Sequence, residues 1–147
     1  MATRHACDAV EGVQVKYVMG IGCHSEATPD EIVALIHSVL REYHVEAGMI
    51  SAIATGWMKA EAENIAHAAQ LLQWPLRVMS QAQCRAVAQR AITQSARVLT
   101  VYGVPSVAET AALAAAGKNA QLLGARINSA VASCAIVQCE VARGEGI

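Results

Sequence analysis

The chain has 147 residues, an apolar content of 54% and a net charge of −1 at pH 7. This length suits one domain with one core, and the near-neutral charge argues against nucleic acid or an acidic membrane surface as a partner. No apolar run reaches the ~18 residues of a membrane span, and the N-terminus lacks the pattern of a signal peptide, so we expect a cytoplasmic protein. The five cysteines are scattered and odd in number, which predicts free thiols.

The first strand and helix have the clearest pattern in the chain. An apolar run predicts a strand over 15–20, and apolar residues at helical spacing predict a helix over 29–43. Thr28 suits the N-cap of this helix, and Glu31 lies three residues later, where its side chain can close a capping box.

A glycine turn joins this strand to this helix. Gly20 and Gly22 lie at the carboxyl end of the strand, where open α/β sheets bind ligands. They either admit a ligand to the backbone or only allow the turn. Cys23 and His24 could form a nucleophile and base, or bind a metal. However, adjacent side chains of an extended segment point to opposite faces, which favours a turn cysteine and a solvated histidine.

The rest of the chain alternates between strand and helix patterns. Strands are predicted at 49–54, 76–79, 119–123 and 130–138, and helices at 59–72, 81–90 and 107–116. The segment 93–102 is ambiguous, because its β-branched residues favour a strand while Ser95 could cap a short helix. The last two strands are too close in sequence for a crossover and should pair antiparallel.

These elements predict a three-layer α/β/α domain with a mixed, mostly parallel five-stranded sheet. We place this single domain at 15–140, between flexible tails at 1–14 and 141–147.

Four side chains follow the predicted strands and turns, and three of them have two interpretations. Thr55 and Lys59 lie just past the second strand. Lys59 is either solvated or binds a carboxylate, and the second is favoured because a cation is unfavourable at a helix N-terminus without an anion. Ser106 and Glu109 fit a capping box better than a catalytic pair, since no histidine neighbours the serine. Glu109 could still act as a general base in a dry site.

Several motifs together resemble a known family. They are Gly20-Ile-Gly-Cys23, Thr28-x-x-Glu31-Ile32, Ala54-Thr55, Lys59, Gly103-Val-Pro-Ser-Val-Ala-Glu109, Ala111-Ala-Leu113 and Ala116-Gly117. They resemble the CobE family, which shares its fold with the C-terminal domain of the cobalamin biosynthesis protein CbiG. The resemblance covers about 15–138. It implies a five-stranded mixed sheet and a helix rather than a strand at 95–102. As the other parts of CbiG are absent from the sequence, it points to the aerobic corrin pathway.

The resemblance implies a role in cobalamin biosynthesis, in which the protein binds or acts on a precorrin, a tetrapyrrole rich in carboxylates. One alternative is a lactone hydrolase that releases a two-carbon fragment, with Glu109 or Lys59 assisting water attack. Another is a non-catalytic carrier that works with corrin methyltransferases. The ligand-binding candidates are Gly20, Gly22, Cys23, Thr55, Lys59, Ser106 and Arg126. Arg126 stands where the family often has a lysine, and it keeps the charge but cannot act as an amine nucleophile.

The predicted site is a cleft formed by the loops 20–27, 55–59 and 103–109, with Lys59 and Ser106 facing it. Trp57, Met58 and Met79 are candidates for its apolar floor. No histidines or cysteines have the spacing of a zinc site, so no metal or other cofactor is predicted.

Overall fold

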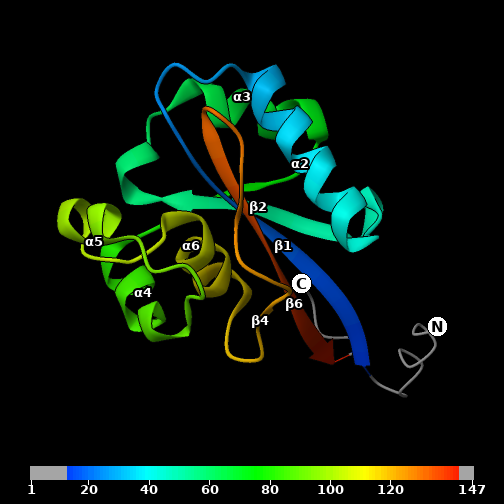
Figure 1. Ribbon diagram of the computed structural model, residues 1–147. Coiled ribbons are helices and arrows are strands. Elements are labelled where there is room, and N and C mark those ends of the chain that lie inside the picture. Colours follow the sequence, from blue (N-terminus) through cyan, green and yellow to red (C-terminus); the bar gives the residue numbers. More distant parts are fainter. Residues whose placement is uncertain (1–12, 143–147) are drawn as a thin grey trace.

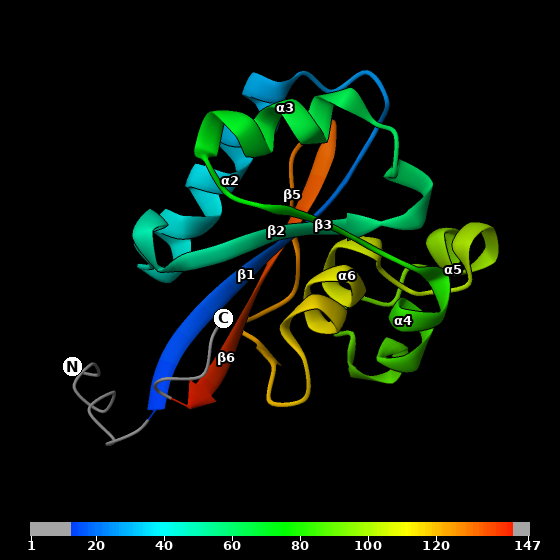
Figure 2. The same ribbon diagram turned by 180° about the vertical axis from the view of Figure 1, so that it is seen from behind.

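A mixed sheet forms the centre of the computed structural model, which describes residues 13–142 (Figures 1 and 2). Its strands are β1 (Val13–Cys23), β2 (Ile50–Gly56), β3 (Leu76–Met79), β4 (Gln121–Leu122), β5 (Ile127–Asn128) and β6 (Ala132–Ala142). The strand order is β3-β2-β1-β6-β4, and β5 also pairs with β6. The pairs β1–β2 and β2–β3 are parallel, whereas β6 runs antiparallel to β1, β4 and β5.

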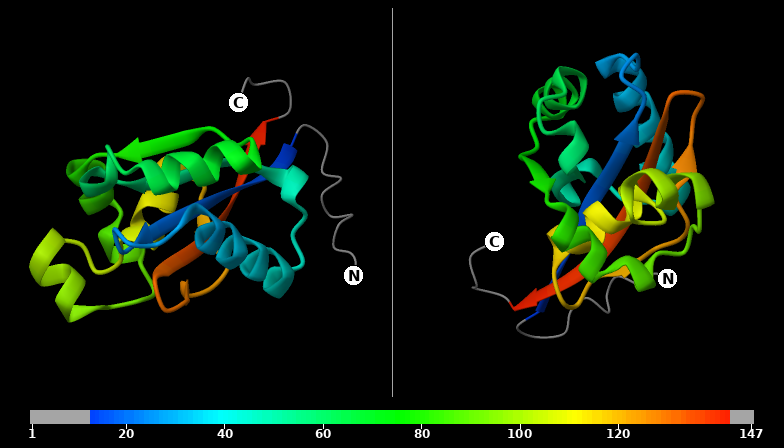
Figure 3. Two further views of the ribbon diagram at one scale, coloured as in Figure 1. Left: turned by 90° about the horizontal axis from the view of Figure 1, so that it is seen from above. Right: turned by 90° about the vertical axis from the view of Figure 1, so that its left-hand side faces the viewer.

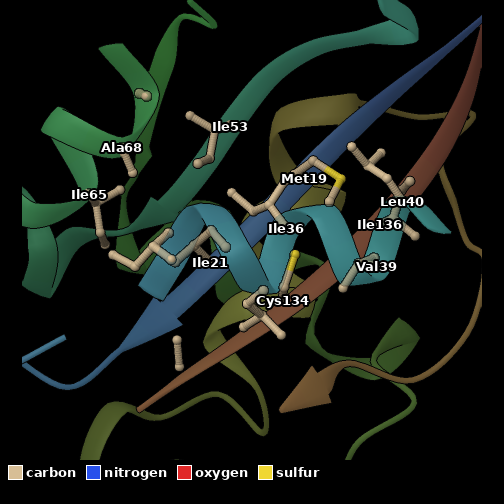
Figure 4. Close-up of a cluster of buried hydrophobic side chains, with 14 of the residues drawn as sticks. Met19, Ile21, Ile36, Val39, Leu40, Ile53, Ile65, Ala68, Cys134 and Ile136 are labelled. Atoms are coloured by element: carbon tan, nitrogen blue, oxygen red, sulfur yellow. The ribbon is translucent and has the colours of Figure 1, made fainter. Parts of the chain in front are cut away.

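Helices cover both faces of the sheet and make the three predicted layers (Figure 3). Helices α2 (Pro29–Tyr43) and α3 (Glu63–Leu72) cover one face, where Ile36 and Ile65 pack against Met19, Ile21 and other sheet residues (Figure 4). Helices α4 (Gln81–Ala86), α5 (Ala96–Tyr102) and α6 (Val107–Ala116) lie on the other side of the sheet.

Local sequence accounts for helix α2. The Thr28 hydroxyl accepts the N–H of Glu31 at 3.1 Å, and the Glu31 carboxylate accepts the N–H of Thr28 at 2.9 Å. This capping box satisfies N–H groups that have no partner within the helix. The apolar positions predicted at helical spacing all face the core: Ile32, Leu35, Ile36, Val39 and Leu40. The predicted helix over 29–43 is therefore confirmed.

On the second face of the sheet, helix α6 packs closely against β1. The helix is buried from Val107 to Leu113 and consists largely of alanine, so its backbone can approach the sheet. At Gly20 in β1, a Cβ atom would lie 2.0 Å from the carbonyl oxygen of Ala108. Glycine at this position is therefore a requirement of helix–sheet packing.

Several predicted boundaries differ from the structure. The sheet has a sixth strand, β5, which only its pairing with β6 reveals. The helix predicted at 59–72 begins at Glu63, because Trp57–Lys59 forms a 3₁₀ turn. The helix predicted at 81–90 ends at Ala86 and is followed by a 3₁₀ turn at Ala88–Arg90.

Other predictions are confirmed or refined. The ambiguous segment is helix α5, and the Ser95 hydroxyl accepts the N–H of Val98 at its start. Strands β4 and β6 pair antiparallel as predicted. The long β1–β6 ladder pairs Val13 with Ala142 and Gln14 with Val141, so both expected tails, 1–14 and 141–147, are wrong at these positions. The remaining parts of the expected tails, 1–12 and 143–147, lie outside the described residues.

Within 13–142, no single helix is both long and apolar enough to cross a membrane. The bent pair α5 and α6 passes that test only when its two helices are counted together.

Candidate functional site

A cleft of about 500 Å³ lies beside the carboxyl ends of β1 and β2. Helix α5, the 3₁₀ turn after β2, the N-terminus of α6 and the β5–β6 hairpin surround it. The turn after β2 and α5 lie on the same side of the molecule (Figures 1 and 2). The lining residues include Gly22, Cys23, His24, Met58, Lys59, Arg97, Val98, Val101, Tyr102, Val107, Ala108, Arg126 and the hairpin residues 128–133.

The structure brings the three predicted loops to this one cleft. The first loop contributes Gly22 and Cys23, and the second contributes Lys59. The third contributes Val107 and Ala108 at the start of α6. Parallel strands place their carboxyl ends at one edge of the sheet, which explains the convergence of the first two loops. Arg126, predicted from the resemblance, reaches the same cleft from the segment between β4 and β5.

Four predicted site residues lie outside the cleft lining. Gly20 packs under α6, and the buried Thr55 hydroxyl donates to the carbonyl oxygen of Ile21 at 2.7 Å. Ser106 is fully buried, and its hydroxyl accepts the N–H of Glu109 at 3.3 Å. The expectation that Ser106 faces the cleft is therefore wrong, because this side chain caps α6 from within the core.

Glu109 is also fully buried, and its carboxylate is surrounded by donors. One oxygen accepts the N–H of Ile92 at 2.8 Å and that of Thr93 at 2.9 Å. The other accepts the Thr93 hydroxyl at 2.5 Å and the N–H of Arg126 at 2.8 Å. These contacts give the carboxylate a structural role, while the catalytic role suggested for Glu109 stays a prediction.

The apolar floor differs in part from the expected one. Met58 lines the cleft, whereas Met79 belongs to the core beneath α6. Trp57 packs edge-on against the lining residue Tyr102, with ring centroids 6.3 Å apart, but does not itself line the cleft.

The charged side chains of the cleft are all basic. Lys59, Arg97 and Arg126 line it, and within the described chain no aspartate or glutamate does. None of the three forms an ion pair with another described residue. The Arg126 Nε is a buried atom without a hydrogen-bond partner in the described part of the chain. Because the whole chain carries a net charge of −1, this concentration of positive charge is local, and it favours an anionic ligand.

Cys23 lies in the same cleft next to Lys59. Burial raises the pKa of the Cys23 thiol, and the nearby Lys59 charge and a hydrogen bond from Asn64 lower the pKa by less. A thiol with a raised pKa is protonated at neutral pH and is a poor nucleophile. The structure shows no group of three or more acidic, histidine or cysteine side chains in 13–142 that could hold a metal ion.

The proximity of Cys23 to Lys59 predicts a pH profile. We expect iodoacetamide to alkylate Cys23 slowly at pH 7 and faster above the ordinary thiol pKa, as the thiolate forms. In Lys59→Met the profile should move to higher pH, because the charge that stabilises the thiolate is gone. Mass spectrometry of the Cys23 peptide measures the rate, and an unchanged profile in the variant would contradict the proximity.

Sequence reasoning missed the contribution of α5. Arg97, Val98, Val101 and Tyr102 line the cleft, and Val101 is 61% exposed. The spacing of Val98, Val101 and Tyr102 matches one face of a helix. This signal was present, but the strand propensity of the same residues obscured it.

Comparison with known proteins identifies the family. The family described as "Cobalamin synthesis G C-terminus" matches residues 17–137. Protein CobE from Sinorhizobium sp. is 33% identical over 128 residues, which cover 87% of this chain and 83% of that protein.

Solved structures agree with this match. The crystal structure of CobE, a protein from the cobalamin (vitamin B12) biosynthetic pathway, aligns with a TM-score of 0.80 and 30% identity over 84% of this chain and 90% of that chain. Cobalamin biosynthesis protein chiG from Agrobacterium tumefaciens aligns with a TM-score of 0.66 and 33% identity over 82% and 96% of the two chains. The chain therefore belongs to the CbiG C-terminal family and is a cobalamin biosynthesis protein of the CobE and CbiG type.

Proposed function

We propose that this protein binds a precorrin or related corrin precursor in the cleft between α5 and the β5–β6 hairpin. The observation that carries the proposal is a set of three basic side chains, Lys59, Arg97 and Arg126, that form no ion pair within residues 13–142, in a cleft that no acidic residue of this range lines. A corrin precursor carries acetate and propionate groups around its ring, and each carboxylate can accept a charge-assisted hydrogen bond from such a side chain.

The apolar part of the cleft suits the ring itself. Val98, Val101 and Tyr102 present one apolar face of α5, and Met58 adds a flexible side chain. The cleft volume of about 500 Å³ falls within the range of about 300–1,000 Å³ that is typical of small-molecule sites. An apolar surface bordered by separated cations matches an apolar ring bordered by separated anions.

Binding is the function that this geometry supports best. Opening a lactone requires a base or nucleophile at the ligand, but Glu109 is fully buried, is not among the residues that line the cleft, and accepts hydrogen bonds from three backbone N–H groups. The Cys23 thiol is held protonated at neutral pH because burial raises its pKa. We therefore propose that the protein holds an intermediate for other enzymes of the corrin pathway, such as the methyltransferases.

A titration with hydrogenobyrinic acid tests this proposal. We expect a saturable shift in the visible spectrum of the corrinoid and its co-elution with the protein on gel filtration. Uroporphyrin is a useful comparison, because it carries carboxylates on a planar ring and separates corrin recognition from general anion binding. The absence of both a spectral shift and co-elution would overturn the proposal. Release of acetaldehyde from a precorrin lactone would instead favour the hydrolase.

A further inference from the structure

The two sides of the cleft are connected through one buried carboxylate. We infer that Glu109 is a positioning residue, which fixes the segment leading into α5 and the main chain at Arg126 in one arrangement. Its two oxygens accept hydrogen bonds from Ile92, Thr93 and Arg126. As regards ligand binding, this inference rests on the proposed function.

The first side of the cleft depends on the segment before α5. Glu109 holds the N–H groups of Ile92 and Thr93, and the Ser95 N–H donates to the carbonyl oxygen of Pro105 at 3.2 Å. Helix α5 has no buried residue of its own. Its position depends on the partly buried side chains of Val98 and Tyr102, which pack against the core, and on attachments at its ends, of which the Glu109 contacts are the charge-assisted ones.

The second side of the cleft depends on Arg126. Its main-chain N–H donates to Glu109 at 2.8 Å, while Arg126 lines the cleft and its buried Nε has no hydrogen-bond partner among the described residues. No described residue therefore holds this Nε in place by accepting a hydrogen bond from it. The hydrogen bond to Glu109 holds the main chain of Arg126 one residue before β5, whose pairing with β6 begins at Ile127.

A glutamate suits this position better than its amide. A carboxylate accepts on both oxygens, and here each oxygen faces two donors. In Glu109→Gln, the amide oxygen can replace the acceptor for Ile92 and Thr93. The amide NH₂ then faces the N–H of Arg126, and two donors cannot form a hydrogen bond. The Thr93 hydroxyl can rotate to accept from the NH₂. The variant therefore disconnects Arg126 selectively.

Amide hydrogen exchange tests this connection without any ligand. In Glu109→Gln we expect the Arg126 N–H to exchange faster, while the N–H groups of Ile92 and Thr93 keep most of their protection. Thr93→Val is the matched control, because it removes one donor to the same carboxylate but leaves all three backbone contacts in place. Unchanged exchange at Arg126 in Glu109→Gln would overturn the inference.

Binding of hydrogenobyrinic acid then tests the functional consequence. We expect Glu109→Gln to weaken binding by about tenfold, the lower end of the loss of a charge-assisted contact, and Thr93→Val to leave it nearly unchanged. Adding Glu109→Gln to Arg126→Ala should weaken binding little further, because both changes remove one contribution. If Glu109→Gln instead only disturbed the fold, a smaller fraction of the protein would bind ligand, and the measured stoichiometry would fall. Its effect on binding would then add to that of Arg126→Ala.

The two proposals can fail separately. If wild type binds the corrinoid and Glu109→Gln binds it equally well, the positioning inference is wrong and the proposed function stands. If wild type does not bind, the proposed function is wrong, and the exchange of the Arg126 amide still decides whether Glu109 fixes this backbone.

Discussion

Replacing Lys59 with alanine is expected to weaken binding of hydrogenobyrinic acid by about ten- to hundredfold. Lys59 lines the cleft and forms no ion pair within the described chain, so its charge is available to a ligand carboxylate. A charge-assisted hydrogen bond of this kind contributes about 1.5–3 kcal/mol, which gives the stated change in affinity. A spectral titration of both proteins at the same ionic strength measures it.

Salt and a second lysine provide the controls for this prediction. Raising the salt concentration should weaken binding in wild type more than in Lys59→Ala, because the variant has lost one screened charge interaction. Lys118→Ala removes the same charge from a separate hollow next to Arg90 and should bind like wild type. Equal affinities for wild type and Lys59→Ala would exclude Lys59 from the site.

Replacing Gly20 with alanine is expected to destabilise the fold by about 3 kcal/mol, the upper end of what overpacking a core costs. The added Cβ would lie 2.0 Å from the carbonyl oxygen of Ala108 and 2.8 Å from the Cβ of Ala112. The nearer atom belongs to the backbone of a buried helix. Relief therefore requires α6 to move away from β1, with loss of core contacts.

Gly22 provides a matched control two residues further along the same strand. A Cβ there would meet its nearest neighbour, a Val107 side-chain atom, at 3.7 Å, which is ordinary contact. Gly22→Ala should therefore change the free energy of unfolding by less than about 0.5 kcal/mol. Urea unfolding of both variants separates the two glycines. A Gly20→Ala protein as stable as wild type would show that the close approach of α6 does not require glycine.

The sequence predicted those elements whose determinants lie within the element itself. The capping box of Thr28 and Glu31 and the apolar spacing behind it gave α2 its observed bounds. Strand β5 and the full length of β6 depend on pairing with residues distant in sequence, and a two-residue strand has no period to detect. Gly20 and Gly22 could not be distinguished in the sequence, because only the position of α6 makes glycine a packing requirement at Gly20.

The candidate site was predicted only in part, because some of its residues are placed by tertiary packing and not by local sequence. Strand topology brings the loops of Gly22 and Lys59 together, and that rule could be applied in advance. The motif from Ser106 to Glu109 indicated a helix start, but nothing in it showed that both side chains would be buried. Arg97 was missed because its segment has the composition of a strand, and its place in the cleft follows from the tertiary position of α5.

The amide chemical shifts of the labelled protein, followed as hydrogenobyrinic acid is added, show where the corrinoid binds. We expect the largest changes at the cleft, in 22–24, at Lys59, in 97–102 and in 126–133. Saturable shifts confined to these segments would agree with a corrinoid held between α5 and the β5–β6 hairpin. Shifts concentrated instead around Arg90 and Lys118, or no shifts at saturating ligand, would contradict it.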